Sequence, residues 1–443
     1  MIIRLSDHFT YKKLIRFTLP SMIMMVFTSI YGVVDGLFVS NFVGTTAFAA
    51  VNIVMPFLMV LGGVGAMLGA GGSALVAKTL GEGDNAKAHR YFTMIIKLMV
   101  IVGAFFSIVG ITFIRPVSYL LGADDAMIND CVVYGTTTLI FNAALLMQYT
   151  FQSFLITAEK PNLGLVVTVA AGVTNMVLDA VLIAVMNMGV VGAALATGLS
   201  QLVGGMIPLF FFLSKKNNTI LRFAKARFEL RPILKACGNG VSEMMSSISG
   251  SITGILYNRQ LMAYAGENGV AAYGVIMYAS FIFIAIFAGY SNGSAPIVGY
   301  HYGAGNRREL KNMLRKSMTF VIISGAIMLV VGLALASPLA GIFVGYDGEL
   351  WEMTTRALRI CFSVFIIMGV NVYASSFFTA LNNGGVSAAI SFMRSLILPI
   401  ATILILPPLF GLDGIWISLP AGEFLSLFVS IAYLLMGRRQ YGY

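Results

Sequence analysis

Charged residues are scarce in this chain of 443 residues: Asp, Glu, Lys and Arg together supply 10%, against 58% for apolar residues. A soluble domain carries about 25% charged residues, so this chain has too little polar surface for a soluble globule of its length. The mean hydropathy of +0.89 agrees. The composition therefore predicts a protein that resides in the lipid bilayer.

Cysteine and histidine are also rare, with three of each. The cysteines are odd in number and far apart, which predicts neither a disulfide framework nor a metal site; they are Cys131, Cys237 and Cys361. The histidines fall near loops, and no cluster of paired Asp residues accompanies them. A Ser/His/Asp set or an Asp-bound metal is therefore missing, and we expect neither an enzyme nor a bound cofactor.

Long apolar runs dominate what remains. Each has about 20 residues or more, enough to cross roughly 30 Å of hydrocarbon as a helix. Alternating strand patterns are absent, so these spans should be helices. The fold class we predict is an all-α membrane protein with about twelve transmembrane helices, at 14–40, 48–77, 91–114, 128–157, 162–186, 189–213, 233–262, 269–300, 313–336, 350–380, 386–408 and 411–436.

The chain also repeats itself. Residues that are 222 positions apart, as Gly81 and Gly303 are, match without a gap along most of the sequence. Nine Gly–Gly coincidences occur, whereas about 2.5 are expected by chance. Six spans per half is an even number, so both halves cross the bilayer in the same direction and form parallel repeats. We expect a six-helix lobe at 1–213, a basic linker at 214–232 and a second lobe at 233–443, around a central cleft.

Basic residues set the orientation that we expect. Of the 28 Lys and Arg residues, 22 fall in the termini, in the linker or in loops on one side. Because Lys and Arg of short loops stay in the cytoplasm, both termini should be cytoplasmic, in a cell-membrane protein. The net charge of +10 is spread over loops that would face anionic lipid, so we expect contact with membrane lipid and not with nucleic acid.

Ionisable residues inside the spans are few, and each is costly to place there unless paired or solvated. Asp35, Asn175, Asp179 and Thr197 lie at similar depths in the first half. Two carboxyl groups in such a setting disfavour double ionisation, so they could bind and release a proton, or hold Na⁺ with the neutral oxygens of Asn175 and Thr197. The alternative is that the acids only make local hydrogen bonds.

The second half carries a different polar set, Glu243, Arg394 and Glu423. These residues could form a network that either locks the structure or binds substrate. At the repeat offset Asp35 corresponds to Tyr257 and Asp179 to Ala401, which favours an ion site in the first half alone. Further candidates for a substrate cavity are Gln148, Tyr257, Asn258, Asn371 and Tyr373.

Several short motifs, taken in order, are typical of one transporter family. They are Pro20, Tyr-Gly-Val-Val-Asp at 31–35, Ala49-Ala50, Gly-Glu-Gly-Asp at 81–84, Thr-Asn-Met-Val-Leu-Asp at 174–179 and Gly-Ala-Gly-Asn at 303–306. With twelve spans in two parallel repeats, the chain resembles the multidrug and toxic compound extrusion (MATE) family, prokaryotic type, over its whole length.

The resemblance implies an antiporter that expels amphipathic, often cationic organic compounds in exchange for inward H⁺ or Na⁺. It assigns ion coupling to Asp35, Asn175, Asp179 and Thr197, and a helix bend to Pro20. Some members place an acid in the tenth span, but 353–380 contains no Asp or Glu. Glu243 and Glu423 could replace that acid, or the first half could couple alone.

We expect a monomer in which the two lobes rock against each other to open the cleft to either side of the membrane. Binding of a proton or Na⁺ at Asp35 and Asp179 would control which side is open. A flippase for lipid-linked precursors is the alternative, because related families share this general architecture. Such a protein should have a basic cavity for a pyrophosphate, and few cations lie within the spans here.

Overall fold

The computed structural model describes residues 3–214 and 217–443, and all regular secondary structure within them is helical. The first half contains α1 (Tyr11–Phe38), the π-helical turn η1 (Val39–Val43), α2 (Thr45–Gly81), α3 (Asn85–Leu120), α4 (Ile128–Ile140), α5 (Asn142–Thr157), α6 (Pro161–Leu178), the π-helical turn η2 (Asp179–Val185) and α7 (Gly189–Leu213). The second half contains α8 (Leu230–Gly303), α9 (Arg307–Val344), α10 (Gly348–Phe362), α11 (Phe365–Ala380), α12 (Gly384–Phe392), the π-helical turn η3 (Met393–Ile397) and α13 (Leu398–Tyr441).

The predicted number of spans is confirmed once bent and merged helices are separated. Eight helices of the described residues are long and apolar enough to cross a membrane, and the bent pairs α4–α5 and α10–α11 raise that number to ten. The 74-residue α8 and the run from Gly384 to Tyr441 each contain a glycine outside helical geometry, Gly266 with φ 59° and Gly411 with φ 62°. Only glycine adopts such angles at low cost, so the chain turns there and both runs divide into two spans.

The duplication is visible in the backbone as well as in the sequence. Glycines with positive φ occur in three pairs that are related by the repeat offset, at Gly44 and Gly266, Gly83 and Gly305, and Gly189 and Gly411. The first-half glycines and Gly305 lie at the boundaries between successive helices, and Gly266 and Gly411 are the non-helical points at which α8 and α13 turn. The matching glycines are therefore retained turns between corresponding spans of the two halves.

One matched turn shows what the Gly-x-Gly motif does. Gly83 and Gly305 adopt positive φ just after α2 and α8 end, and the residue after each glycine caps the next helix. Asp84 accepts a hydrogen bond from Lys87 N (3.0 Å), and Asn306 accepts one from Glu309 N (3.1 Å). A side-chain acceptor at this position satisfies an amide that the first helical turn would otherwise leave unpaired. The motif at 81–84 and its counterpart at 303–306 therefore define the turns that precede α3 and α9.

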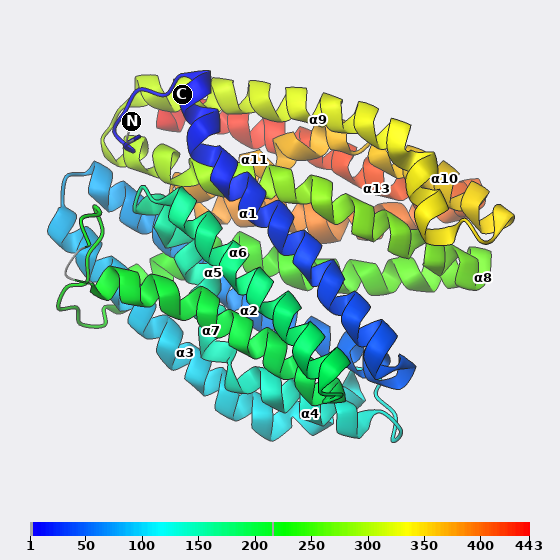
Figure 1. Cartoon of the computed structure of the whole chain (residues 1–443). Coiled ribbons are helices and arrows are strands. Elements are labelled where there is room, and N and C mark those ends of the chain that lie inside the picture. The colour runs from blue at the N-terminus through cyan, green and yellow to red at the C-terminus, as the bar shows by residue number, and fades with distance from the viewer. Residues whose placement is uncertain (1–2, 215–216) are drawn as a thin grey trace.

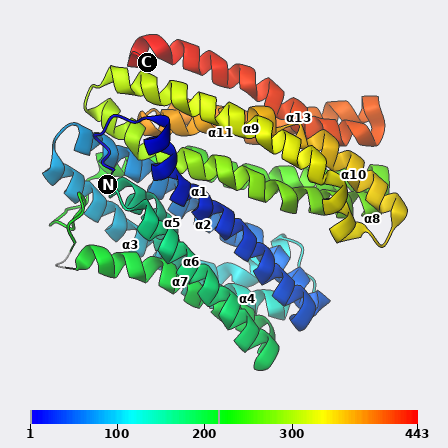
Figure 2. The same cartoon turned by 45° about the horizontal axis from the view of Figure 1, so that its top comes forward.

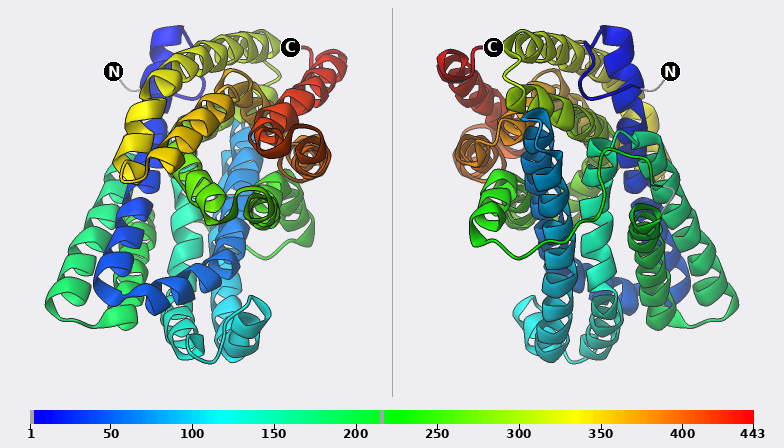
Figure 3. Two further views of the ribbon diagram at one scale, coloured as in Figure 1. Left: turned by 90° about the vertical axis from the view of Figure 1, so that its right-hand side faces the viewer. Right: turned by 90° about the vertical axis from the view of Figure 1, so that its left-hand side faces the viewer.

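The two halves form two helical bundles, which we call the N-lobe (α1–α7) and the C-lobe (α8–α13). The bundles converge at the end that carries both chain termini, and they diverge toward α4 and α10 (Figure 1). The same divergence appears when the molecule is tilted (Figure 2), and the two end views show α9 and α13 of the C-lobe above the helices of the N-lobe (Figure 3). The described part of the linker also lies at the convergent end, which we call the terminal end.

Backbone contacts close the lobes against each other at the terminal end. A Cβ atom added to Gly81 would lie 1.9 Å from Tyr300 O, and one added to Gly303 would lie 2.0 Å from Lys78 O. These two contacts are symmetry mates under the repeat offset. A third contact puts Gly71 of α2 against Ala236 O and Gly240 of α8. Small residues let helices approach backbone to backbone, so the structure is closed at the terminal end.

Candidate functional site

Two buried carboxyl groups meet in the N-lobe. Asp35 lies in α1 and is 8% exposed, and Asp179 is the first residue of η2 and is fully buried. The Asp35 carboxyl group lies in electrostatic contact with the side chains of Asp179 and Asn175. Asn175, in α6, is one helical turn before Asp179, so both project from the same face of the continuous α6–η2 segment. The helix becomes π-helical at Asp179, a distortion that is frequent at functional sites.

The cluster presents oxygen atoms that accept no hydrogen bond from residues 3–214 or 217–443. These buried atoms are Asp35 Oδ1, Asn175 Oδ1, Asp179 Oδ1, Asp179 Oδ2, Thr197 Oγ1 and Gln201 Oε1. An unpartnered buried polar atom is destabilising by about 1–3 kcal/mol, and more when it is charged. Six such acceptors in one place form a site that a proton or a small hard cation would satisfy.

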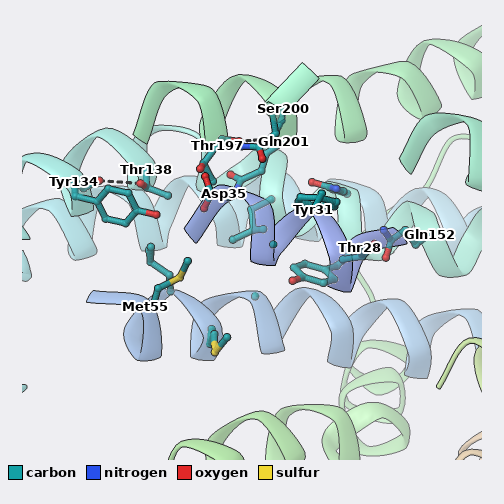
Figure 4. Close-up of a pocket in the computed structure, with 18 residues that line it drawn as sticks. Thr28, Tyr31, Asp35, Met55, Tyr134, Thr138, Gln152, Thr197, Ser200 and Gln201 are labelled. Atoms are coloured by element: carbon teal, nitrogen blue, oxygen red, sulfur yellow. Dashed lines mark hydrogen bonds between the residues drawn. The ribbon is translucent and has the colours of Figure 1, made fainter. Parts of the chain in front are cut away.

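A cavity of about 280 Å³ opens onto this cluster. Asp35, Asn175 and Thr197 line it, whereas Asp179 does not. In Figure 4, Asp35 points toward the side of the cavity where Thr197 and Gln201 lie. The remaining lining residues include three tyrosines, two methionines and two further glutamines: Tyr31, Tyr134, Tyr149, Met55, Met59, Gln148 and Gln152. No Lys, Arg or His is among the described residues that line it, so Asp35 is the one carboxyl group, with no basic group beside it, in that lining.

The polar residues of the second half form an ion pair inside the C-lobe. Arg394 Nε donates to Glu423 Oε1 at 2.8 Å, and Asn371 Nδ2 donates to Glu423 Oε2 at 2.7 Å. Asn371 Nδ2 also contacts the main-chain oxygen of Glu423 at 2.9 Å. Glu243 faces Arg394 electrostatically but makes no ion pair within the described residues. Glu423 is therefore neutralised and hydrogen-bonded.

The proposed substrate-cavity residues fall in different places. Gln148 lines the N-lobe cavity. Tyr257 is buried in the C-lobe, with its hydroxyl 2.7 Å from Ser418 Oγ and its ring stacked on Tyr273. Tyr373 is buried beside Tyr290, and Asn258 is exposed. The structure thus brings one of the five predicted cavity residues to the acidic cluster.

Helical spacing points to lining residues that our sequence interpretation missed. Tyr31 lies one turn before Asp35 in α1, and Gln201 lies one turn after Thr197 in α7. Residues four apart share a helix face, so each missed residue could have been found from its predicted neighbour. Tyr134 and Met55 had no such signal, because neither α4 nor α2 carries a predicted site residue.

Pro20 lies within α1, which runs from Tyr11 to Phe38. Proline has no amide hydrogen, so the main-chain oxygen one turn earlier loses its helical partner at this point. The distortion to π-helix in this segment occurs at Val39–Val43, after Asp35, not at Pro20. The bend that we predicted at Pro20 stays a prediction.

Two pseudo-symmetric helical lobes, with an acidic cavity within the bilayer part of one of them, define a membrane transporter. The MatE family model matches residues 20–181 and 242–405, two segments that begin at equivalent positions of the repeat. The chain therefore belongs to the MatE family. The predicted resemblance is confirmed, and so is the expectation that the protein is a transporter and not an enzyme.

Curated relatives cover almost the whole chain. The chain is 24% identical to the multidrug export protein MepA of Staphylococcus saprophyticus, over 97% of this chain and 94% of the relative. It is 23% identical to MepA of Staphylococcus haemolyticus over the same shares. Both similarities extend through the two lobes and the linker.

Solved structures match the fold over a similar length. A MATE protein in its straight conformation gives a TM-score of 0.91 at 22% identity, covering 98% of this chain and 97% of the other. An outward-facing MATE transporter of the MOP superfamily gives a TM-score of 0.91 at 24% identity, with the same coverage. A MOP superfamily transporter from Pyrococcus furiosus gives 0.89 at 23% identity, again over 98% and 97%. These matches show that the lobes have the arrangement of this fold.

Proposed function

We propose that this protein is a secondary antiporter of the cell membrane that exports amphipathic, cationic organic compounds in exchange for H⁺ or Na⁺. The observation that carries the proposal is the cluster of unpartnered oxygen atoms around Asp35 and Asp179 at the wall of a cavity. The relatives' name, multidrug export protein, supports export of organic compounds. The closure at the terminal end supports one of the two states that alternating access requires.

The position of the two acids suggests how ion and substrate exclude each other. Asp35 lines the cavity and Asp179 lies behind it. With no ion bound, the negative charge of Asp35 attracts a cationic substrate into the cavity. A proton or Na⁺ held between Asp35 and Asp179 neutralises that charge and weakens the attraction. Exchange then follows, because each ligand stabilises a different state of the same carboxyl group.

The cavity wall suits flat or flexible organic cations. Tyrosine rings attract cations over their faces, and methionine side chains adapt to ligands of different shape. Tyr31, Tyr134 and Met55 provide both around Asp35. A pyrophosphate would need basic groups, and the described residues that line the cavity include none. The chemistry of the wall therefore favours export of cations over flipping of a lipid-linked precursor.

Orientation and driving force follow from charge. The terminal end carries most of the basic residues, which supports its placement in the cytoplasm. In that placement the lobes diverge toward the outside. One elementary charge that moves inward down 100 mV supplies about 2.3 kcal/mol, enough for roughly fiftyfold accumulation per ion.

Transport in proteoliposomes tests this proposal. A fluorescent organic cation serves as substrate, and a pH gradient and a Na⁺ gradient are imposed separately. At least one gradient should drive accumulation by the wild-type protein. Asp35→Asn keeps the size of the side chain but removes its charge, so it should lower gradient-driven accumulation about tenfold or more.

The matched control is Asp125→Asn, which removes an exposed carboxylate in the turn that precedes α4. It should transport at the wild-type rate. If neither gradient drives uptake by the wild-type protein, ion-coupled antiport is wrong. If Asp35→Asn and Asp125→Asn transport equally well, the assignment of the coupling site is wrong even though the function stands.

A further inference from the structure

A second cavity, of about 210 Å³, lies at the terminal end where α2, α3 and α8 meet. Each helix contributes two side chains that are one turn apart: Lys78 and Glu82 from α2, Lys87 and Tyr91 from α3, and Arg231 and Lys235 from α8. The first four belong to the N-lobe and the last two to the C-lobe. The cavity is thus shared between the lobes.

Positive charge in this cavity is not balanced. Lys78 Nζ lies 3.5 Å from Glu82 Oε1, but Lys87, Arg231 and Lys235 make no ion pair within the described residues. Four cations therefore share one carboxylate. Like charges that line one small cavity repel each other, and an anion placed between them would remove that repulsion. The first turns of α3 and α8 also face this region, with the positive ends of their helix dipoles.

Aromatic contacts hold two of the ammonium groups in place. Lys78 Nζ lies 5.3 Å from the centre of the Tyr302 ring, and Lys87 Nζ lies 5.8 Å from that of Tyr91. A cation over an aromatic face is held electrostatically without being neutralised. Lys87 therefore remains available to a negatively charged ligand, whereas Lys78 is already paired with Glu82.

The surface beside the cavity is apolar. Leu230 is 70% exposed and Leu234 is 59% exposed, both in the first two turns of α8, and Phe228, just before that helix, is 52% exposed. The cavity itself lies within two turns of the ends of α2, α3 and α8, and each of these helices is long and apolar enough to span a bilayer. Exposed leucines beside unpaired cations suit a ligand that has both an anionic head and hydrocarbon chains.

We propose that this cavity binds the phosphate headgroup of an anionic phospholipid, whose acyl chains lie along Phe228, Leu230 and Leu234. The headgroup is held by Lys87 of the N-lobe together with Arg231 and Lys235 of the C-lobe. Lys235 directly precedes Ala236, whose main-chain oxygen packs against Gly71. A lipid bound here bridges the lobes beside this close backbone contact, so it stabilises the conformation that is closed at the terminal end.

Thermal unfolding of the full-length protein in detergent, with and without phosphatidylglycerol, tests the site. A thiol-reactive dye reports unfolding, because Cys131 and Cys361 are buried in the folded protein. Phosphatidylglycerol should raise the midpoint, and phosphatidylcholine should not. Arg231→Gln/Lys235→Gln should weaken the apparent affinity for phosphatidylglycerol about tenfold or more, since each Lys or Arg near an anionic surface contributes about 1 kcal/mol.

The control variant is Lys311→Gln/Arg315→Gln, which removes two exposed cations, also one turn apart, from α9. It should keep the wild-type response to phosphatidylglycerol. Equal losses in both variants would mean that the lipid responds only to overall charge, and an unchanged response in Arg231→Gln/Lys235→Gln would also overturn the proposal. If that variant does not fold, Lys87→Gln tests the same cavity from the N-lobe.

Inorganic phosphate distinguishes a lipid from a free anion. At millimolar concentration it should leave the midpoint nearly unchanged, because it lacks the acyl chains that contact Phe228, Leu230 and Leu234. If phosphate raises the midpoint as much as phosphatidylglycerol does, and Arg231→Gln/Lys235→Gln abolishes that rise, the cavity binds a soluble anion and the lipid proposal fails.

Discussion

The two lobes differ in the chemistry of their buried polar residues at equivalent positions. Asp35 of the N-lobe is an acid with an unpartnered buried oxygen atom, whereas its counterpart Tyr257 in the C-lobe is neutral and hydrogen-bonded to Ser418. The buried acid that the C-lobe does have, Glu423, is paired with Arg394 and Asn371. One duplicated architecture therefore carries an unsatisfied acidic cluster in one half and a neutralised pair in the other. An acid can exchange a cation with solvent only where the protein has not already neutralised it.

We expect the largest difference between the lobes in the effect of removing a buried acid on the stability of the fold. Glu423→Gln leaves the Arg394 guanidinium without its carboxylate, and breaking a buried pair in this way costs about 3–5 kcal/mol. Asp179→Asn removes an unpaired buried acid, so it should leave the unfolding midpoint unchanged or raise it. Thermal unfolding of both variants measures the difference. A larger loss in Asp179→Asn would mean that the N-lobe acid, and not Glu423, is the structural one.

Glu243 sharpens this comparison, because it faces Arg394 and could take over from Glu423. Glu423→Gln/Glu243→Gln should then be less stable than the sum of the two single variants predicts, by about 0.5–3 kcal/mol. Strict additivity in the same unfolding assay would show that Glu243 does not support Arg394.

Transport activity should instead be more sensitive to substitutions in the N-lobe than to substitutions in the C-lobe. Asp179→Asn should lower gradient-driven accumulation about tenfold, while binding of an organic cation persists because Asp179 does not line the cavity. Tyr257→Phe, at the C-lobe position equivalent to Asp35, should change accumulation by less than about twofold. Substrate binding by fluorescence and uptake in proteoliposomes measure the two effects. Equal losses of uptake in both variants would contradict a coupling site confined to the N-lobe.

The terminal-end contact offers a test of symmetry. Gly81→Ala and Gly303→Ala each place a methyl group against a main-chain oxygen of the other lobe, and overpacking of this kind costs about 1–3 kcal/mol. The two losses should be similar because the contacts are symmetry mates. Gly274→Ala, where nothing lies near the added atom, should instead be neutral or stabilising. Unequal losses at Gly81 and Gly303 would show that the lobes do not close symmetrically.

The smallest effect concerns Glu159, in the turn between α5 and α6. Burial raises the pKa of this carboxyl group, although a hydrogen bond from Leu5 N (2.6 Å) opposes the rise. A raised folded-state pKa means that its contribution to stability is fully present below the unfolded pKa and is lost as pH rises through the folded one. The wild-type midpoint should therefore fall, relative to that of Glu159→Gln, as pH rises through the acidic range. Parallel midpoint–pH curves for the two proteins would contradict this assignment.

Much of the fold could be predicted because bilayer physics leaves few alternatives. Twelve apolar runs, the glycine pairs and the family motifs gave the spans and the duplication, and the structure confirms them. The site was harder to predict. Asp35, Asn175, Asp179 and Thr197 stand out because polar groups are costly in a bilayer, and the structure gathers their unpartnered oxygen atoms around one cavity. Residues such as Tyr134 and Met55 line that cavity with no comparable signal, since aromatic and methionine side chains occur throughout the spans.

The sequence by itself determined the bilayer location, the helical class, the turns and the scarcity of buried charge, because each depends on local composition and on the backbone freedom of glycine. Only the tertiary structure decided which charges meet. Among the described residues, Arg394 pairs with Glu423 and not with Glu243, and Asp35 faces Asp179 with no Lys or Arg in the lining of their cavity. Those outcomes depend on helix rotation and packing between segments far apart in the chain, where a shift of one residue turns a side chain by about 100° and into a different environment.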